Sequence, residues 1–203
     1  MLWEPETTPI LEDATLKPTN PYGESKLLVE QMLGWMNVSH GFRYASLRYF
    51  NVAGAIEGYG EAHEPESHLI PLTLDVALGR RANIKIFGRD YPTKDGTCVR
   101  DYIHVRDLAE AHLLALAAIE EKSRVIYNIG NGRGFTVLEV IESVRRVTGR
   151  PVAVEECERR MGDPAVLVAS SEKIKLELGW EPQFAELDDI IASAWEWHQR
   201  RYT

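Results

Sequence analysis

The chain has 203 residues, enough for one α/β domain or slightly more. Its formal net charge of −8, from 23 basic and 31 acidic residues, argues against a nucleic-acid-binding protein. No apolar run is long enough to span a bilayer, so we expect no membrane partner. The two cysteines, Cys98 and Cys157, lie far apart without metal-ligating neighbours, which fits a reducing, cytoplasmic compartment.

The first predicted helix carries a tyrosine and a lysine at helical spacing. Asn20 can cap a helix and Pro21 fits its first turn, so a helix is predicted over 22–39. Tyr22 and Lys26 then lie one turn apart on the same face. Because a lysine ammonium next to a phenol favours the phenolate, Tyr22 is a candidate general base. The alternative is an exposed helix with an incidental pair, since the spacing alone is a weak signal.

The remaining pattern alternates strands with helices. Before the first helix, residues 1–19 are predicted to be an extended loop. After it, in chain order, we expect a strand at 42–48, a glycine-rich loop at 49–60, a helix at 68–78, a strand at 84–87, a polar loop at 88–97, a strand at 99–104, a helix at 105–121, a strand at 124–129, a helix to 148, a strand at 152–155, and helices at 171–178 and 186–201. Thr136 and Glu139 form a capping box for the helix to 148. This alternation indicates an α/β architecture with parallel strands.

Three further patterns yield no cofactor or metal site. The glycines in Gly130-Asn-Gly132-Arg-Gly134 have the spacing G-x-G-x-G, which differs from the G-x-G-x-x-G of dinucleotide-binding loops. A tight strand-to-helix connection explains them better. The six histidines lie apart, and no pair sits at a metal-binding spacing with a carboxylate, so we predict no metal site. Trp195 and Trp197 are expected to be packing residues on the last helix.

Five stretches carry most of the specificity of the sequence. They are Asn20-Pro-Tyr-Gly-Glu-Ser-Lys26, Leu47-Arg-Tyr-Phe-Asn-Val-Ala-Gly54, His63-Glu-Pro-Glu-Ser-His-Leu-Ile-Pro71, Ile86-Phe-Gly-Arg-Asp-Tyr-Pro-Thr-Lys-Asp-Gly-Thr-Cys-Val-Arg-Asp-Tyr-Ile-His-Val105 and Arg159-Arg-Met-Gly-Asp-Pro164. In this order they closely resemble the UDP-glucose 4-epimerases, which are extended short-chain dehydrogenase/reductase enzymes. These enzymes interconvert UDP-glucose and UDP-galactose with tightly held NAD, and the resemblance covers the whole chain.

The resemblance implies a redox role for three residues. Tyr22 resembles the catalytic base, and Lys26 resembles the lysine that assists it and binds the nicotinamide ribose. Tyr49 looks like a cofactor-side contact. In the implied reaction, Tyr22 removes the 4-hydroxyl proton while C4 gives hydride to NAD; the 4-keto sugar turns over and hydride returns to its other face.

The resemblance also implies a substrate site. Its members are Asn51 as a donor to the substrate diphosphate, His68 and Leu69 near the substrate, Lys85, Ile86 and Phe87 on the strand that meets the uracil ring, Arg100 and Arg160 as diphosphate ligands, Asp163 as the partner of the uridine ribose hydroxyls, and Leu167 beside the sugar's 2-substituent. Arginine forks suit a pyrophosphate, and a carboxylate accepts hydrogen bonds from a diol. The alternatives are that Arg100 pairs with Asp101 or Asp107, that Asp163 is a simple turn residue, and that Leu167 belongs to a core.

The implied fold is a partial Rossmann-like parallel sheet with the smaller C-terminal substrate-binding region of an extended short-chain dehydrogenase/reductase. Residues 1–60 would be a remnant of the NAD-binding domain with the tyrosine–lysine helix. Residues 61–203 would be mainly the UDP-sugar-binding region, with strands and helices returning to the Rossmann sheet. A complete member has a glycine-rich loop and several βα units before the tyrosine. We therefore expect the C-terminal three-fifths of an epimerase, without most of the NAD site.

The expected function is that of a UDP-glucose 4-epimerase in a truncated form that is inactive alone. Its partners would be UDP-glucose, UDP-galactose and, because leucine at position 167 is intermediate in volume, UDP-N-acetyl sugars to a partial extent; the family commonly forms homodimers. One alternative is a non-catalytic remnant that retains UDP-sugar binding or pairs with a separate N-terminal chain. Another is a related UDP-sugar dehydratase or decarboxylase, which the Asp-Tyr-Pro-Thr-x-Asp-Gly-Thr loop disfavours.

Overall fold

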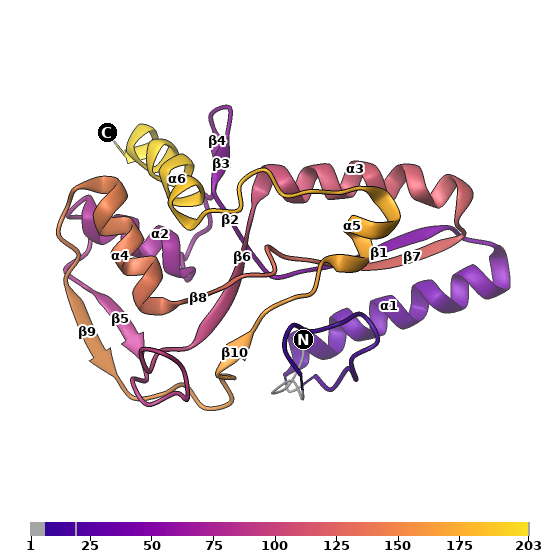
Figure 1. The fold of residues 1–203 in the computed structure, drawn as a ribbon, viewed down its shortest axis with the longest axis horizontal. Helices are drawn as coiled ribbons and strands as arrows, with labels where there is room; N and C mark the ends of the chain where they lie inside the picture. The colour runs from indigo at the N-terminus through magenta and orange to yellow at the C-terminus, as the bar shows by residue number, and fades with distance from the viewer. Residues whose placement is uncertain (1–6, 19, 203) are drawn as a thin grey trace.

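The computed structural model describes residues 7–18 and 20–202, which form a mixed α/β structure (Figure 1). Its helices are α1 (Pro21–His40), α2 (Leu69–Ala77), α3 (Val105–Glu121), α4 (Val137–Thr148), α5 (Glu172–Leu178) and α6 (Leu187–Tyr202). Its strands are β1 (Tyr44–Tyr49), β2 (Asn51–Ala53), β3 (Ala55–Ile56), β4 (Tyr59–Gly60), β5 (Ile84–Phe87), β6 (Val99–His104), β7 (Arg124–Ile129), β8 (Gly134–Thr136), β9 (Val154–Cys157) and β10 (Val166–Leu167). The expected α/β class with a partial parallel sheet is confirmed.

Helix α1 begins where its sequence predicts. The Asn20 side chain accepts a hydrogen bond from the Gly23 N–H at 2.8 Å, and Pro21 follows in the first turn. The helix ends at Gly41, whose φ of 66° is the left-handed conformation that glycine adopts without strain. Thr19, which precedes the cap, lies outside the described residues. These caps fix the register that places Tyr22 and Lys26 on one face.

One half of the molecule is built on the parallel pair β1 and β7. Figure 1 shows α1 on one side of this pair and α3 with α5 on the other. Trp180, which is buried, donates from Nε1 to the carbonyl of Asp107 at 3.0 Å and so joins the chain after α5 to α3. The core of this half contains Ile103, Leu108, Ala111, Val125, Tyr127, Ile129, Ile174 and Trp180.

The other half is organised around β6, β5 and three helices. Strand β6 pairs in parallel with β2 and β10 and antiparallel with β8, whereas β5 pairs in parallel with β9. Helices α2, α4 and α6 pack together over Ile70, Leu74, Val140, Ile141 and Ile190. The capping box of α4 is confirmed, since Thr136 and Glu139 bond each other's backbone N–H groups. Trp195 packs partly buried against this core, as expected.

The predicted glycine-rich loop at 49–60 was wrong. Residues 51–53 form β2 against β6, and residues 55–60 form the hairpin of β3 and β4. Strands β8 and β10 were also missed, and β9 lies two residues later than predicted. Strands β8, β9 and β10 have only two to four residues. Their formation depends on hydrogen bonds to a partner strand distant in sequence, and a local sequence pattern does not predict it.

The glycine stretch at 130–134 is a tight connection, as predicted. The Asp101 carboxylate accepts hydrogen bonds from the N–H groups of Asn131 at 2.8 Å and Gly132 at 3.3 Å, and from that of Ala169 at 3.0 Å. A Cβ at Gly130 would lie 2.4 Å from this carboxylate, so only glycine fits. Burial raises the pKa of Asp101 to about 6, although these N–H groups favour the charged form. The loop therefore surrounds an internal carboxylate instead of a phosphate.

Candidate functional site

A cavity of about 1200 Å³ opens between α1, β1, β2, α2, β5, β6 and the loop before β10. The predicted site residues that line it are Tyr22, Lys26, Tyr49, Asn51, His68, Leu69, Lys85, Phe87, Arg100, Arg160, Asp163 and Leu167. Ile86 does not line it: its side chain is 1% exposed and points into the core, because neighbouring residues of a strand face opposite sides. The structure thus brings together every predicted site residue except Ile86.

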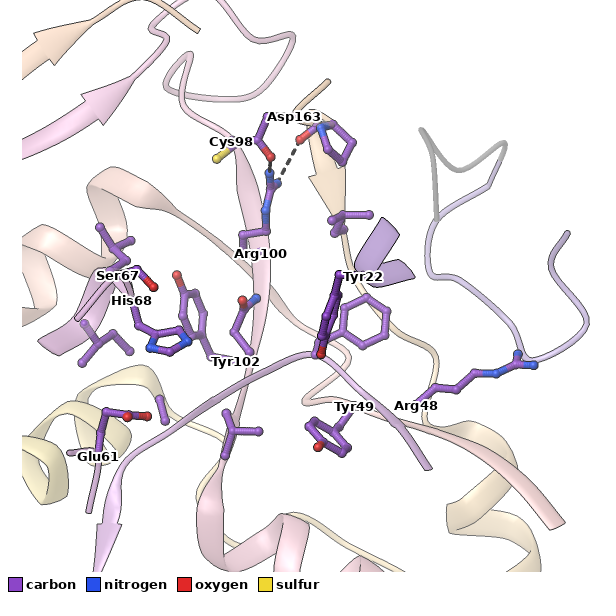
Figure 2. Close-up of a pocket in the computed structure, with 18 of the residues that line it drawn as sticks. Tyr22, Arg48, Tyr49, Glu61, Ser67, His68, Cys98, Arg100, Tyr102 and Asp163 are labelled. Carbon is purple, nitrogen blue, oxygen red and sulfur yellow. Dashed lines mark hydrogen bonds and ion pairs between the residues drawn. The ribbon is translucent and has the colours of Figure 1, made fainter. Parts of the chain in front are cut away.

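The tyrosine–lysine pair lies at the mouth of this cavity. The Lys26 ammonium lies 5.2 Å from the centroid of the Tyr22 ring, as expected for residues one turn apart. The Tyr22 side chain is 60% exposed, and Figure 2 shows it beside the cavity with Tyr49 on the same side. The phenol is therefore accessible to a molecule bound in the cavity.

Arg100 and Asp163 pair with each other. The Arg100 guanidinium donates to the Asp163 carboxylate, and its other branch donates to the carbonyl oxygens of Val99 and Pro164 at 2.8 and 2.9 Å (Figure 2). The alternative pairings of Arg100 were wrong because both other carboxylates already accept from backbone N–H groups, Asp101 as described above and Asp107 from two residues before α6. Asp163 also closes a turn with Arg160. A cation and an anion are thus held together at the cavity wall.

The adjacent residues Arg159 and Arg160 make different contacts. Arg160 lies over the Phe87 ring, with its guanidinium carbon 3.9 Å from the ring centroid. Arg159 turns away, bonds Asp90 and stacks on Tyr91 at 4.0 Å. Only Arg160 of these two lines the cavity. One face of the cavity therefore offers an aromatic ring beside a cation.

Strand β6 contributes a residue that the sequence analysis missed. Tyr102 lies on the same face of β6 as Arg100 and lines the cavity, and it pairs in register with Asn51 of β2. Burial raises the pKa of the Tyr102 phenol well above its ordinary value, so it remains a hydrogen-bond donor at neutral pH. The side-chain alternation of a strand in the Val-Arg-Asp-Tyr run was the signal that could have found it. Asn51 donates to the carbonyl of Asp101 at 2.9 Å.

The loop before α2 holds two histidines and a glutamate close together. Potential ligand atoms of His63, Glu66 and His68 all lie within 4.8 Å of one another. A pair of histidines at a metal-binding spacing with a carboxylate was not found in the sequence, so these three side chains were not predicted to lie together. The reason is that the spacing H-x-x-E-x-H matches no helical metal motif, and only the folded loop brings the three side chains together.

The charge of the cavity differs from that of the chain. Its lining includes the cations Lys26, Arg48, Arg81, Lys85, Arg100 and Arg160 and the carboxylates Glu30, Glu61 and Asp163. In a chain with a net charge of −8, this local excess of cations favours an anionic ligand. A fork of guanidinium groups is suited to phosphate oxygens.

Comparison with known proteins identifies the family of the chain. The family model described as "NAD dependent epimerase/dehydratase family" matches residues 3–130. A UDP-glucose 4-epimerase of Halalkalibacterium halodurans is 52% identical over 199 residues, which are 97% of this chain and 60% of that protein. A crystal structure of a UDP-glucose 4-epimerase superposes with a TM-score of 0.94 at 50% identity, covering 98% of this chain and 61% of that one.

A further structural neighbour carries ligands. The UDP-glucose 4-epimerase of Bifidobacterium longum in complex with NAD⁺ and UDP is 39% identical, with a TM-score of 0.91 and coverage of 97% of this chain and 60% of that one. The chain thus spans about 60% of the length of the relatives it matches. No helix in the described ranges 7–18 and 20–202 is long and apolar enough to cross a membrane. On its sequence and its fold, the chain belongs to the NAD dependent epimerase/dehydratase family.

Proposed function

We propose that this chain supplies the catalytic tyrosine and the UDP-sugar site of a UDP-glucose 4-epimerase. The observation that carries the proposal is that one cavity is lined both by the Tyr22–Lys26 pair and by Arg100, Arg160 and Asp163. A base for a sugar hydroxyl and ligands for a nucleoside diphosphate therefore face the same space. The relatives named UDP-glucose 4-epimerase support the same assignment.

The substrate would be held by its nucleotide. Phe87 offers a ring face, and Lys85 and Leu69 line the cavity nearby, as needed for a uracil. Arg100 and Arg160 would bind the diphosphate, with Asn51 and His68 as further donors, and Asp163 would accept from the ribose hydroxyls. Arg100 donates to the Asp163 carboxylate, so a diphosphate bound by Arg100 would lie beside Asp163.

Tyr22 would then act on the sugar. It takes the proton of the 4-hydroxyl as general base and returns it at the end of the reaction. Lys26, one turn away, holds its ammonium 5.2 Å from the centroid of the Tyr22 ring, so a positive charge lies beside the proposed base. NAD, when bound, supplies the acceptance and return of hydride at C4. The residues of this chain bind and orient the sugar and move one proton.

Three residues of the cavity lining suit the nicotinamide end of NAD. Tyr22, Lys26 and Tyr49 line the cavity together, which suits a nicotinamide ribose. The glycine stretch at 130–134 does not fit a pyrophosphate, because its N–H groups already bond Asp101. We therefore assign residues 1–60 to the NAD-binding domain with the tyrosine–lysine helix, and residues 61–203 mainly to UDP-sugar binding. Strand β7 of the second region pairs with β1 of the first, which supports a return of the chain to the Rossmann sheet.

Titration calorimetry of the 203-residue chain tests this proposal. UDP is expected to bind at one site per chain. NAD is expected to bind far more weakly, because the N–H groups of the glycine stretch at 130–134 bond Asp101 and cannot hold its pyrophosphate. UV spectra of cofactor released by heat check whether NAD is retained after purification. An absence of UDP binding by the folded chain would contradict the proposal.

A second candidate function is UDP-sugar binding without catalysis. Arg100, Arg160 and Asp163 line the cavity, and they would bind a nucleotide without any contribution from Tyr22. An active chimera that joins these 203 residues to the part of the Halalkalibacterium halodurans epimerase that they do not cover would exclude it. The free cysteines Cys98 and Cys157 support a cytoplasmic location for either function.

Leu167 is expected to set the acceptance of N-acetylated substrates. It lines the cavity and pairs in register with Arg100, whereas the adjacent Val166 packs against the cluster of Tyr91 and Cys98. Leucine leaves more room than tyrosine, so partial acceptance of UDP-N-acetyl sugars is expected. In the chimera, Leu167→Tyr should lower kcat/KM for UDP-N-acetylgalactosamine by roughly 10-fold or more, the effect of a steric misfit of about 1–3 kcal/mol.

UDP-galactose provides the control for this variant. Its kcat/KM should change little in Leu167→Tyr, because the smaller 2-hydroxyl does not need the space that the acetamide occupies. An equal loss with both substrates would show that Leu167 does not gate the cavity. Leu167 would then be a core residue, which is the alternative that its apolar neighbours suggest.

A further inference from the structure

The segment 61–68 connects the β3–β4 hairpin to helix α2 and carries His63, Glu66 and His68. Both of its ends are held. The Glu61 carbonyl accepts from Trp197 Nε1 at 2.9 Å and from the Arg201 guanidinium at 3.1 Å, both on α6. At the other end, His68 caps α2 with an extended backbone. The three side chains therefore belong to a loop whose ends have fixed positions.

The three side chains have the arrangement of a metal-ligand set. Their potential ligand atoms lie within 4.8 Å of one another, and His68 Nδ1 lies 2.8 Å from Glu66 Oε1. The centroids of the His63 and His68 rings are 5.6 Å apart at an interplanar angle of 47°. Two imidazoles bound to one tetrahedral zinc ion, with Zn–N near 2.0–2.1 Å, have ring centroids about 5 Å apart. The observed rings are thus close to the spacing that one shared ion imposes.

The surroundings of the glutamate orient it for this role. Glu66 Oε1 accepts hydrogen bonds from the backbone N–H groups of Ser67 and His68, both at 2.7 Å. These bonds fix the carboxylate, as outer-shell partners do in metal sites. Glu61 bonds the His63 N–H at 3.0 Å and adds negative charge at the same loop. His63 and His68 are exposed, so an ion can reach them from solvent.

We propose that His63, Glu66 and His68 bind a divalent transition-metal ion of the zinc class at the rim of the cavity. Two imidazoles and a carboxylate form the His₂Glu donor set that suits zinc, and a fourth position stays open to water. His68 also lines the cavity, so the bound ion competes with a UDP-sugar for this side chain. The competition, but not the ion site, rests on the proposed function.

Calorimetric titration of the 203-residue chain with ZnCl₂ alone tests the ion site. One ion per chain is expected, and His63→Ala and Glu66→Gln should each weaken binding by more than about 10-fold, since even outer-shell losses cost that much. His40→Ala is the matched control, because His40 is an exposed histidine on α1 that should not affect the titration. Mg²⁺ should give no binding, since it prefers oxygen ligands.

Cobalt gives a second readout, which reports the coordination of the bound ion. Co²⁺ bound by these residues should show visible absorption bands that are lost in His63→Ala, with far-UV circular dichroism confirming that the variant is folded. Zinc binding that survives in both His63→Ala and Glu66→Gln, or no zinc binding by the folded chain, would overturn the site.

The competition is tested separately with UDP. Saturating zinc should weaken UDP binding in the unmodified chain and have no effect in His63→Ala, a residue outside the cavity lining whose loss should leave UDP affinity without zinc unchanged. Zinc binding with unchanged UDP affinity would overturn the competition. A chain that binds zinc but never UDP would instead contradict the proposed function.

Discussion

Tyr22→Phe is expected to reduce epimerase turnover in the chimera by about 10²–10⁴-fold, the range for loss of a general base. The Tyr22 ring lies beside the cavity, with the Lys26 ammonium 5.2 Å from its centroid. The substitution removes only the phenol oxygen, which is the proposed base. Phenylalanine retains the ring and its packing, and UDP affinity should therefore change little. A coupled assay with UDP-galactose measures the turnover, and calorimetry measures the UDP affinity.

Tyr59→Phe is the matched control for this experiment. Tyr59 is an exposed tyrosine of the β3–β4 hairpin that does not line the cavity. Its substitution should leave both turnover and UDP affinity unchanged. Turnover that also survives in Tyr22→Phe would place the base on another residue and remove the catalytic part of the proposal.

Arg100→Ala and Arg160→Ala are each expected to weaken UDP binding by about 1.5–3 kcal/mol, the range for a hydrogen bond to a charged group. This corresponds to a loss of roughly 10–150-fold in affinity. Arg100 also donates to the backbone carbonyls of Val99 and Pro164, so its loss removes a contact between β6 and the loop before β10. Arg100→Lys tests the contribution of the guanidinium, because it keeps the charge but not the planar fork that bonds two oxygens at once.

Arg159→Ala is the matched control for Arg160→Ala. The two arginines are adjacent in sequence, yet Arg159 bonds Asp90 and does not line the cavity. Its loss should leave the UDP affinity of the chain within calorimetric error. Unchanged affinity in both Arg100→Ala and Arg160→Ala would show that neither arginine binds the diphosphate.

The sequence by itself determined the features that depend on local bonding. Helix α1 follows from the Asn20 cap and Pro21, and α4 follows from the capping box of Thr136 and Glu139. The spacing of Tyr22 and Lys26 fixed their common face, because a helix turn has a constant length. The order of the motifs indicated the family, and every site residue predicted from it except Ile86 lines one cavity in the structure.

Only the tertiary structure decided the contacts between segments distant in sequence. The short strands β2, β8 and β10 form because β6 supplies their hydrogen bonds. The local sequence of each strand does not predict that β6 is its partner. Which face of β6 and which face of β5 lies toward the cavity was also decided by the fold, so Tyr102 lines the cavity and Ile86 lies in the core.

The partners of the charged groups were likewise decided by the fold. Asp101 is engaged by backbone N–H groups of two loops, which leaves Arg100 to pair with Asp163 instead. His63, Glu66 and His68 lie together because their loop is held at both ends, an arrangement that no fixed sequence spacing encodes. Local hydrogen bonds can be read from neighbouring residues, whereas side-chain proximity across segments depends on where the whole chain places them.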